Sequence, residues 1–420
     1  MISDSPNPAW LAVDFGTSNT AVALPGAGGG VRRIAIEAGS DTLPTAVFFP
    51  PRGGMRIGEA AGEALIQGEE GRYMRALKSV LGTPLLHETR LIGGKRQSLS
   101  DIITAFLAEL RARVTKALGH CPDRILSGRP VHFHTSDPAR DAQAEADLLA
   151  CYRAAGFTEI RFMAEPEAAA WACQAEIGDK TGLIIDIGGG TSDFSVFRAK
   201  AGRVTILANH GIRLGGTDFD RSVSMAHVMP RLGHGGELRR EMGEGLLPVP
   251  NAIFSDLATW ARIPFLYTPD TRREVAAMLR VAVDRKRLSR LSTVLEEELG
   301  HEMAFAVEHG KIAANNGEAK TRIEMGYVEP GLSAPISPGS LDLALRDHRE
   351  ALRIAIQETL QLAGLGADEI GAVILVGGSS LMQLVSGLAE SLLPGAQIHR
   401  SEAFTAVVDG LALAASHQGA

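Results

Sequence analysis

Residues 11–24 read LAVDFGTSNTAVAL, and residues 183–197 read LIIDIGGGTSDFSVF. Each stretch is an apolar run, an Asp, a glycine-containing polar turn and a second apolar run, which is the pattern of a β-hairpin. Glycine has no Cβ and tolerates a positive φ, so such a turn can bring several backbone N–H donors against an anion. We therefore expect two related hairpins that grip a polyphosphate from two sides.

Polar side chains stand at matching places in the two hairpins. Asp14 and Asp186 precede the turns, and Asp193 follows the second turn. The turns also carry hydroxyl donors, at Thr17, Ser18 and Thr191. The carboxylates would repel phosphate unless a cation lay between them, and Mg²⁺ is held in proteins by a few carboxylates together with substrate phosphates. The predicted ligand is thus a metal–nucleotide complex and not a bare anion.

One copy of this pattern would be weak evidence, because Asp and Gly supply turn geometry by themselves. The repetition, with a third glycine motif at Gly377-Gly378-Ser379-Ser380, favours a binding function. The chain contains no Gly-x-x-x-x-Gly-Lys-Ser/Thr run, so it lacks the phosphate loop of the other major class of ATPase. The glycine cluster at 26–30 has no acidic residue at the corresponding spacing, and we interpret it as an ordinary hairpin turn.

The composition is that of a globular protein. The chain has 420 residues, 45% of them apolar, which is enough for two or more domains with their own cores. A net charge of −7 and an aromatic content of 5% argue against a nucleic-acid partner. No stretch approaches about 18 consecutive apolar residues, and the N-terminus has no basic segment followed by an apolar core. We expect a cytoplasmic protein with no nucleic-acid and no membrane partner.

Periodicity and turn residues place the remaining elements. Outside the second hairpin set at 183–209, strands are expected at 11–13, 21–24, 31–36, 45–49, 131–133 and 372–376. Helices are expected at 100–118, 137–155, 165–175, 381–392 and 405–415. Residues 225–325 have mostly helical periodicity. We expect a first lobe at 1–180 and a second lobe at 181–420 that contains an inserted helical subdomain at about 225–325.

Further motifs accompany the hairpins, namely Glu165-Pro166-Glu167-Ala168-Ala169-Ala170, Gly215-Gly216-Thr217-Asp218-Phe219-Asp220, Glu308 with Lys311, and Val373-Ile374-Leu375-Val376-Gly377-Gly378-Ser379-Ser380. With them the chain resembles the ATPase domain of the DnaK-type heat-shock chaperones, and it is most similar to the short DnaK-like proteins of the YegD type. These proteins belong to the superfamily of actin, sugar kinases and heat-shock ATPases. The resemblance covers residues 11–415. It implies an α/β fold of the duplicated actin-like ATPase type, in which two lobes each have a mixed β-sheet flanked by helices.

The resemblance also implies a role for each motif residue, with ATP and Mg²⁺ as ligands. Asp14 and Asp186 would hold the hydrated Mg²⁺, and Glu165 and Asp193 would orient the attacking water. Phosphate oxygens would be bound by Thr17, Ser18 and Thr191. The remaining nucleotide contacts would come from Gly16, Gly188, Gly189, Gly190, Gly215, Gly216, Glu308, Lys311, Gly377, Gly378 and Ser379.

Two of these assignments have plain structural alternatives. Glu165 could serve only as an acidic residue that complements the dipole at a helix N-terminus. Glu308 and Lys311 are three residues apart and could form an ordinary ion pair on a helix surface. The alanine-rich context of Glu165 favours function, and in the family the Glu–Lys pair lines the adenosine pocket.

Several departures from the family matter, and two of them bear directly on activity. The chaperones carry a catalytic lysine after a Gly-x-Ala-Ala run, whereas Gly62 follows the corresponding run at 58–61 here. Lys78 lies in another segment that matches the family, and in the family this segment lies near the nucleotide cleft. Lys78 is therefore the candidate replacement for the catalytic lysine. In the chaperones a peptide-binding domain follows the ATPase, whereas residues 416–420 are all that follow the last expected helix. We expect no peptide-binding domain.

The leading hypothesis is an ATP-binding, slowly hydrolysing conformational switch that alternates between ATP and ADP. Its two lobes would close on the nucleotide and reopen after hydrolysis, and a protein partner would bind the helical insertion. A small-molecule kinase of the same fold is an alternative, although the insertion shows no compact polar acceptor motif. A non-hydrolysing nucleotide sensor, or a scaffold that forms filaments, is another.

Overall fold

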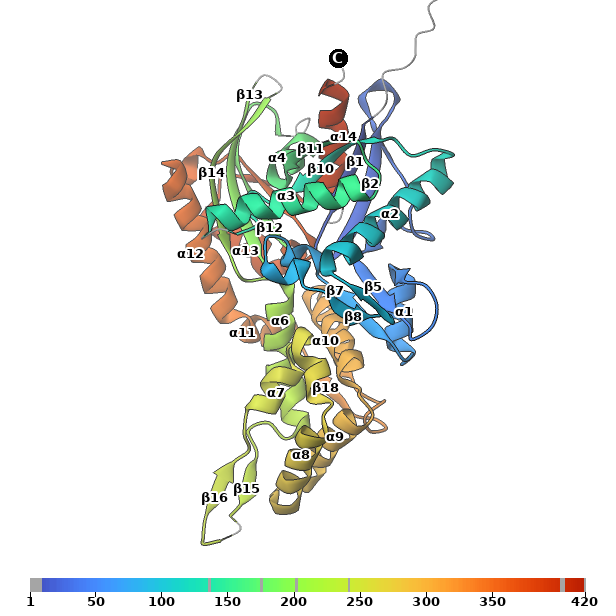
Figure 1. The fold of residues 1–420 in the computed structure, drawn as a ribbon. Coiled ribbons are helices and arrows are strands. Elements are labelled where there is room, and N and C mark those ends of the chain that lie inside the picture. The colour runs from blue at the N-terminus through green and yellow to red at the C-terminus, as the bar shows by residue number, and fades with distance from the viewer. Residues whose placement is uncertain are drawn as a thin grey trace, which may run out of the picture. The chain divides into compact units, whose positions relative to one another are not determined.

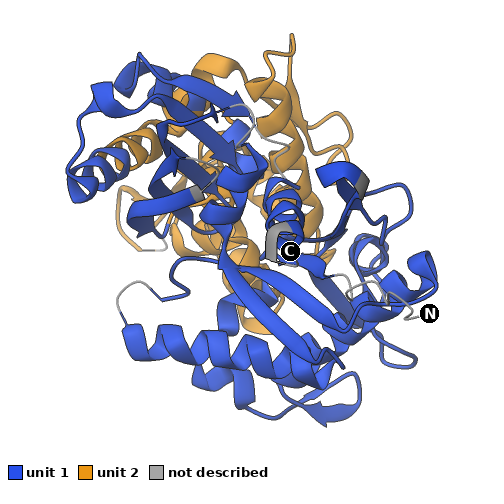
Figure 2. Cartoon of the chain, turned by 90° about the horizontal axis from the view of Figure 1, so that it is seen from above, with its two compact units in different colours: residues 1–213, 355–381, 386–420 blue, residues 214–354, 382–385 orange. Residues whose placement is uncertain are grey.

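The computed structural model describes residues 10–134, 137–173, 177–200, 203–240, 242–400 and 405–418. The chain forms two compact units, which Figure 2 colours blue and orange. Unit 1 comprises residues 1–213, 355–381 and 386–420, and unit 2 comprises residues 214–354 and 382–385. Both predicted hairpins lie in unit 1.

The first sheet of unit 1 contains the first hairpin. Its strands are β1 (Leu11–Phe15), β2 (Asn19–Pro25), β3 (Val31–Arg33), β4 (Thr42–Pro44), β10 (Arg124–Arg129) and β11 (Glu159–Ala164). The order is β11-β10-β1-β2-β3, and β4 also pairs with β2. β1 is antiparallel to β2 and parallel to β10.

The second sheet repeats this arrangement. Its strands are β12 (Thr181–Ile187), β13 (Ser192–Lys200), β14 (Arg203–Ile212), β19 (Ala372–Val376) and β20 (Gln397–Arg400), in the order β14-β13-β12-β19-β20. β12 is antiparallel to β13 and parallel to β19, as β1 is to β2 and β10. The two hairpins therefore occupy equivalent places in two sheets of the same topology (Figure 1), and the predicted duplication is present.

Helices that lie wholly or partly in unit 1 are α1 (Glu59–Ile66), α2 (Leu99–Leu118), α3 (Pro138–Ala154), α4 (Glu165–Ala172), α12 (Arg346–Ala363), α13 (Gln383–Leu392) and α14 (Ala406–Gln418). Local sequence sets their ends. Ser98 forms a capping box with Asp101 at the start of α2, and Gly119 ends that helix with a φ of 82°. Asp137 caps α3, with Pro138 in its first turn, as predicted.

Alternation along β1 decides what packs on each face of the first sheet. Leu11 and Val13 point into a core that they share with α2 and α3. Ala12 points to the opposite face, into a core formed with α4 and α14. Ile184 of β12 belongs to this second core as well. The helices α4 and α14 thus link the faces of the two sheets.

The crossing of α4 and α14 is unusually close. A Cβ atom on Gly410 of α14 would lie 1.7 Å from the carbonyl oxygen of Ala168 in α4, so only glycine fits there. Arg33 of β3 donates two hydrogen bonds to Asp409, from Nε at 2.9 Å and from Nη2 at 2.6 Å. Small side chains and a bidentate ion pair therefore hold α14 in place.

Short elements complete unit 1. A small sheet contains β5 (Ala46–Phe49), β6 (Arg56–Ile57) and β7 (Arg72–Arg75), with α1 packed on β5, and β8 (Arg90–Ile92) pairs with β9 (Lys95–Gln97). The 3-10 segment Leu77–Val80 follows β7, after Ala76 in the left-handed region with a φ of 57°. Leu77 and Leu81 are buried in the core beneath this segment.

Unit 2 is mainly helical, as the periodicity predicted. Its helices include α6 (Gly216–Val223), α7 (Ala252–Leu257), α8 (Pro269–Val281), α9 (Arg285–Glu296), α10 (Gly300–Asn315) and α11 (Pro338–Ala344). Two hairpins accompany them, formed by β15 (Glu237–Arg239) with β16 (Leu246–Pro248), and by β17 (Arg322–Glu324) with β18 (Ser333–Pro335).

Several predicted boundaries were wrong. The strand expected at 131–133 is absent, and the strand lies earlier, at β10. Polar residues and a glycine interrupt the apolar pattern of β10, although it is an interior strand between two parallel neighbours, β11 and β1. The strand expected at 31–36 ends at residue 33, and the helix expected from 381 begins at 383. The predicted end of the helix at 165–175 falls on residues 174–176, which lie outside the described residues.

Candidate active site

The turns of the two hairpins have the same internal hydrogen bond. The N–H of Gly16 donates to the carbonyl oxygen of Asn19 at 3.0 Å, and the N–H of Gly188 donates to that of Thr191 at 2.9 Å. A Cβ atom on Gly16 would lie 2.4 Å from the carbonyl oxygen of Asn19, so the first turn requires glycine. A Cβ atom on Gly189 would lie 3.0 Å from Oγ of Ser18. The two turns, from strands far apart in sequence, therefore lie next to each other.

Strand periodicity brings the carboxylates to the same side. Asp14 follows Ala12 by two residues in β1, and Asp186 follows Ile184 by two residues in β12. Because alternate residues of a strand share a face, both Asp side chains point toward the side of the sheets where α4 packs. Asp193 pairs with Asp186 across β12 and β13. These three carboxylates are half-buried.

An ion pair lies beside these carboxylates. Lys78, in the 3-10 segment after β7, places Nζ 2.5 Å from Oε1 of Glu165, the first residue of α4. The Lys78 side chain is only 7% exposed, and that of Glu165 is 17% exposed. A Cβ atom on Gly128 at the end of β10 would lie 3.3 Å from Cγ of Glu165. Glu165 therefore lies close to β10 and pairs with a buried lysine, a contact that a role in complementing the helix dipole does not require.

The charges of this group act on one another. Burial, followed by the charge of Glu165, raises the pKa of Asp14 from an ordinary 3.8 to about 7, and the charge of Lys78 opposes the rise. The same causes raise the pKa of Asp193 to about 7. The pKa of Asp186 is also raised well above its ordinary value, by burial first and then by the three neighbouring carboxylates. Negative charge therefore exceeds positive charge at this place.

This excess of negative charge fits a bound cation. Mg²⁺ keeps much of its water and takes only one or two protein carboxylates when a polyphosphate supplies the other ligands. Among the described residues no group of three or more His, Cys, Asp or Glu side chains is placed to hold a metal by itself. Asp14 and Asp186, each beside a glycine turn, suit a metal that arrives with a nucleotide.

The glycines after β19 reach the same place. β19 runs parallel to β12, so the carboxyl ends of the two strands meet. Gly377 has a φ of 81°, and a Cβ atom there would lie 2.7 Å from Oδ1 of Asp186. Gly378 and Ser379 follow directly in a 3-10 turn. The third predicted motif is thus brought to the second hairpin.

The other predicted residues belong to unit 2. Gly215 and Gly216 stand at the N-terminus of α6, and Glu308 and Lys311 lie on α10. Lys311 is buried and places Nζ 2.7 Å from Oδ1 of Asp220, the last residue of the motif that begins at Gly215. In the described structure Lys311 therefore joins α10 to α6, and the alternative interpretation, an ordinary ion pair between Lys311 and Glu308, is not borne out.

The sequence did not identify a buried carboxylate that holds the Lys78 segment. Asp147 of α3 is 5% exposed and accepts a hydrogen bond from the N–H of Gly82 at 2.9 Å. Nε2 of His134 lies 2.8 Å from the carbonyl oxygen of Leu81. The signal in the sequence is a charged residue on the buried face of an otherwise amphipathic helix. We interpret Asp147 as a residue that positions the segment carrying Lys78.

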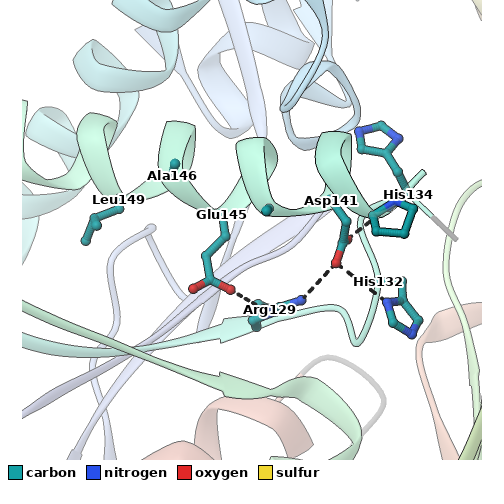
Figure 3. A pocket seen from close by; sticks show the side chains of 9 residues that line it. Arg129, His132, His134, Asp141, Glu145, Ala146 and Leu149 are labelled. Atoms are coloured by element: carbon teal, nitrogen blue, oxygen red, sulfur yellow. Dashed lines mark hydrogen bonds and ion pairs between the residues drawn. The ribbon is translucent and has the colours of Figure 1, made fainter.

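A cavity of about 420 Å³ lies near this segment, where β10 ends and α3 begins. Figure 3 shows Asp141 of α3 between Arg129 and His132, with Glu145 on the other side of Arg129. Asp141 also accepts a hydrogen bond from the N–H of His134 at 3.2 Å. The cavity contains none of the predicted site residues.

Comparison with known proteins finds similar chains. The family model described as "Hsp70 protein" matches residues 10–234, which include both hairpins and the motifs that begin at Glu165 and Gly215. "Chaperone protein DnaK" of Thermosipho melanesiensis is 25% identical over 401 residues, which cover 94% of this chain and 57% of that protein. "Chaperone protein DnaK" of Thermotoga maritima is 26% identical over 380 residues, which cover 89% of this chain and 54% of that protein. The chain spans about half the length of the curated relatives it matches.

Proposed function

The chain belongs to the Hsp70 family, and from this premise we propose that it binds Mg·ATP between its two hairpins and hydrolyses it slowly to ADP and phosphate. The observation that carries the proposal is the arrangement in unit 1. Two equivalent glycine turns lie side by side, carboxylates from both hairpins point the same way, and a buried lysine contacts the carboxylate of Glu165.

We assign the hairpin residues as follows. Asp14 and Asp186 would hold the hydrated Mg²⁺, which when bound neutralises phosphate charge. The hydroxyls of the turns would donate to phosphate oxygens, from Thr17, Ser18 and Thr191, together with the N–H groups of Gly16, Gly188, Gly189 and Gly190. Glu165 and Asp193 would accept hydrogen bonds from the attacking water and orient it.

Lys78 is proposed to replace the family's catalytic lysine. Gly62 of α1 carries no side chain at the corresponding position. The buried amine of Lys78 is a positive charge beside Glu165, where a developing negative charge on the phosphate would be stabilised. The amine of Lys78 already contacts Glu165, so it would have to serve both this carboxylate and the phosphate. We therefore expect slow turnover.

The adenosine side and the conformational cycle are also proposals. Gly215, Gly216, Glu308 and Lys311 of unit 2 would contact adenosine, together with the Gly377–Ser379 turn. We propose two lobes at 1–180 and 181–420 that close on ATP and reopen with ADP, as expected for a chaperone-family switch. A protein partner would bind the helical insertion at 225–325.

The test is phosphate release from Mg·ATP by the purified protein, with nucleotide binding measured on the same samples. Asp186→Ala should abolish release, because it removes a proposed metal ligand, whereas Asp368→Ala, an exposed residue elsewhere in unit 1, should leave it unchanged. Equal release by the wild-type protein and Asp186→Ala would refute the proposed site. Tight binding of ATP without release by the wild-type protein would show a nucleotide sensor instead of an ATPase.

A further inference from the structure

The loop that follows β10 is held by two charged side chains that have no role in the function proposed above. Arg129 is the last residue of β10, and the loop at 130–134 precedes α3 in the chain. Backbone N–H and C=O groups outside helices and strands need hydrogen-bond partners from other sources. In this loop Arg129 and Asp141 supply them, so these two side chains determine its course.

Arg129 provides the hydrogen-bond donors for the carbonyl groups of the loop. Its Nε donates to the carbonyl oxygen of Pro130 at 3.0 Å, and its Nη2 donates to that of Val131 at 2.8 Å. The guanidinium also pairs with Glu145 and lies 3.6 Å from Oδ2 of Asp141, both on α3. Figure 3 shows Arg129 between these two carboxylates. An arginine can serve several acceptors at once because its guanidinium holds its N–H donors in a fixed plane.

Asp141 provides the acceptor for the N–H groups of the same loop. Its Oδ1 accepts hydrogen bonds from the N–H of Phe133 at 2.5 Å and from the N–H of His134 at 3.2 Å. The Asp141 side chain is 16% exposed, so water competes only weakly for these bonds. The loop is thus fixed from both sides, with its carbonyl groups on Arg129 and its N–H groups on Asp141.

The start of this loop is joined to Glu165 through the sheet. Arg129 pairs with Ala164 in the parallel register of β10 and β11, and Ala164 directly precedes Glu165 at the start of α4. Gly128 also approaches Glu165, since a Cβ atom on this glycine would lie 3.3 Å from Cγ of the glutamate. A shift at the end of β10 would therefore move the first turn of α4 and the carboxylate that it carries.

The end of this loop contacts the segment that carries Lys78. Nε2 of His134 lies 2.8 Å from the carbonyl oxygen of Leu81, three residues after Lys78. A Cβ atom on Gly82 would lie 3.0 Å from the same nitrogen, so the ring and the segment are in close contact. Lys78 and Glu165 are 87 residues apart in sequence, yet one short loop contacts the supports of both.

We propose that Arg129 and Asp141 are positioning residues, which set the contact of Lys78 with Glu165 by fixing the loop between their supports. The catalytic consequence rests on the proposed function, in which Glu165 orients the attacking water and Lys78 stabilises charge on the phosphate. Misplacement of either group slows the reaction, while the two hairpins still bind Mg·ATP. The pair therefore affects the rate of hydrolysis and not the affinity for ATP.

The position of Lys78 is measured without an assay of activity. The test is the rate at which a low dose of acetic anhydride acetylates Lys78 in the full chain, followed by mass spectrometry of its peptides. The Lys78 side chain is 7% exposed, so its amine should react slowly in the wild type. Arg129→Met and Asp141→Asn should each raise this rate about tenfold, because a freed loop favours local opening. Lys116, exposed on α2, is the internal reference and should react equally in all samples.

Single-turnover phosphate release and ATP affinity of the same variants test the catalytic consequence. Arg129→Met should slow release about tenfold and leave the affinity unchanged. Arg129→Lys keeps the charge but not the planar set of donors, so its rate should be intermediate. Arg129→Met should slow release much less in a Glu165→Gln background than in the wild type, because the arginine acts through this carboxylate. Arg153→Met, at an exposed arginine on α3, is the matched control and should behave like the wild type.

Urea unfolding establishes that each variant is folded, and if Arg129→Met does not fold, Arg129→Lys and Asp141→Asn provide the same comparisons. Equal acetylation of Lys78 in the wild type and in the variants would overturn the proposal. A loss of ATP affinity as large as the loss of release rate would also overturn it, because Arg129 would then support the nucleotide site as a whole. A wild-type protein that releases no phosphate would refute the proposed function alone, since the acetylation rates would still decide whether Arg129 and Asp141 position the pair.

Discussion

At the scale of single residues, Lys78 distinguishes this chain from the pattern of its family. Its amine is buried against Glu165, so removing it would leave the carboxylate without its partner and the phosphate without a nearby cation. We expect Lys78→Met to slow phosphate release by roughly 30-fold or more, because a charge-assisted contact in a buried site contributes about 2–3 kcal/mol.

The measurement is single-turnover phosphate release, with nucleotide affinity determined in parallel. Lys116→Met, an exposed lysine on α2, is the control for loss of a positive charge and should turn over like the wild type. If Lys78→Met hydrolyses ATP at the wild-type rate, the buried lysine is a structural partner of Glu165 and takes no part in catalysis.

The raised pKa values of the carboxylates predict a pH dependence of stability. Asp14 and Asp193 have pKa values of about 7 in the folded protein and about 3.8 when unfolded, so the folded state binds more protons between these values. Their contribution to stability is complete below pH ~4 and is lost as pH rises through ~7. The free energy of unfolding of the nucleotide-free protein should therefore fall between pH 5 and 7 by about 1 kcal/mol per pH unit for each group.

Urea unfolding across this pH range measures the slope. Asp193→Asn should flatten it, since the amide does not titrate, and added Mg²⁺ should flatten it too by favouring the ionised carboxylates. Asp368→Asn, at an exposed residue, should reproduce the wild-type slope. A wild-type profile that is parallel to that of Asp193→Asn would show that this carboxyl is ionised throughout.

At the scale of elements, the crossing of α4 and α14 determines where Glu165 lies. The alanines that follow Glu165 were interpreted as part of a functional motif, but Ala168, Ala169 and Ala170 are fully buried in the core shared with α14. Their small size allows the close approach at Gly410. The alanines of the motif thus pack α4 against α14, and this packing positions Glu165, the first residue of α4 and a proposed catalytic residue.

We expect Gly410→Ala to destabilise the protein by about 3 kcal/mol or more. The new methyl group would lie 1.7 Å from the carbonyl oxygen of Ala168, so the two helices must separate. Gly387→Ala on α13 is the matched control, because a Cβ atom there meets nothing within 4 Å and alanine favours the helix. Thermal or urea unfolding of both variants gives the comparison, and equal stability of the two would mean that α4 and α14 do not cross this closely.

At the scale of the whole molecule, the helices and strands that could be predicted from sequence are those that local sequence patterns specify. The hairpins, the capped start of α3 and the helical region of unit 2 follow from alternation, turn chemistry and periodicity. The strand β10 was not predicted because its place between two parallel neighbours, and not its own sequence, buries Ser127 and Gly128. The contact of Lys78 with Glu165 spans 87 residues, a separation that no local pattern encodes.

Nucleotide binding should protect residues in both units if the proposed site is correct. Hydrogen exchange with Mg²⁺ and a non-hydrolysable ATP analogue should slow at 14–19 and 186–193 in unit 1, and at 215–220 and 308–311 in unit 2. A ligand present at 100 times its Kd stabilises the bound state by about 2.7 kcal/mol, so amides that exchange through local opening of the site should slow by up to about a hundredfold.

The amides of α8, at 269–281 in unit 2, provide an internal control, because that helix carries none of the proposed nucleotide contacts. Chelation of Mg²⁺ should remove the part of the protection from hydrogen exchange that requires the metal. Protection confined to 14–19 and 186–193 would mean that the residues of α6 and α10 do not contact the nucleotide. In that case the buried pair of Lys311 and Asp220 serves to join α10 to α6, and the proposed contacts of α6 and α10 with adenosine would have to be abandoned.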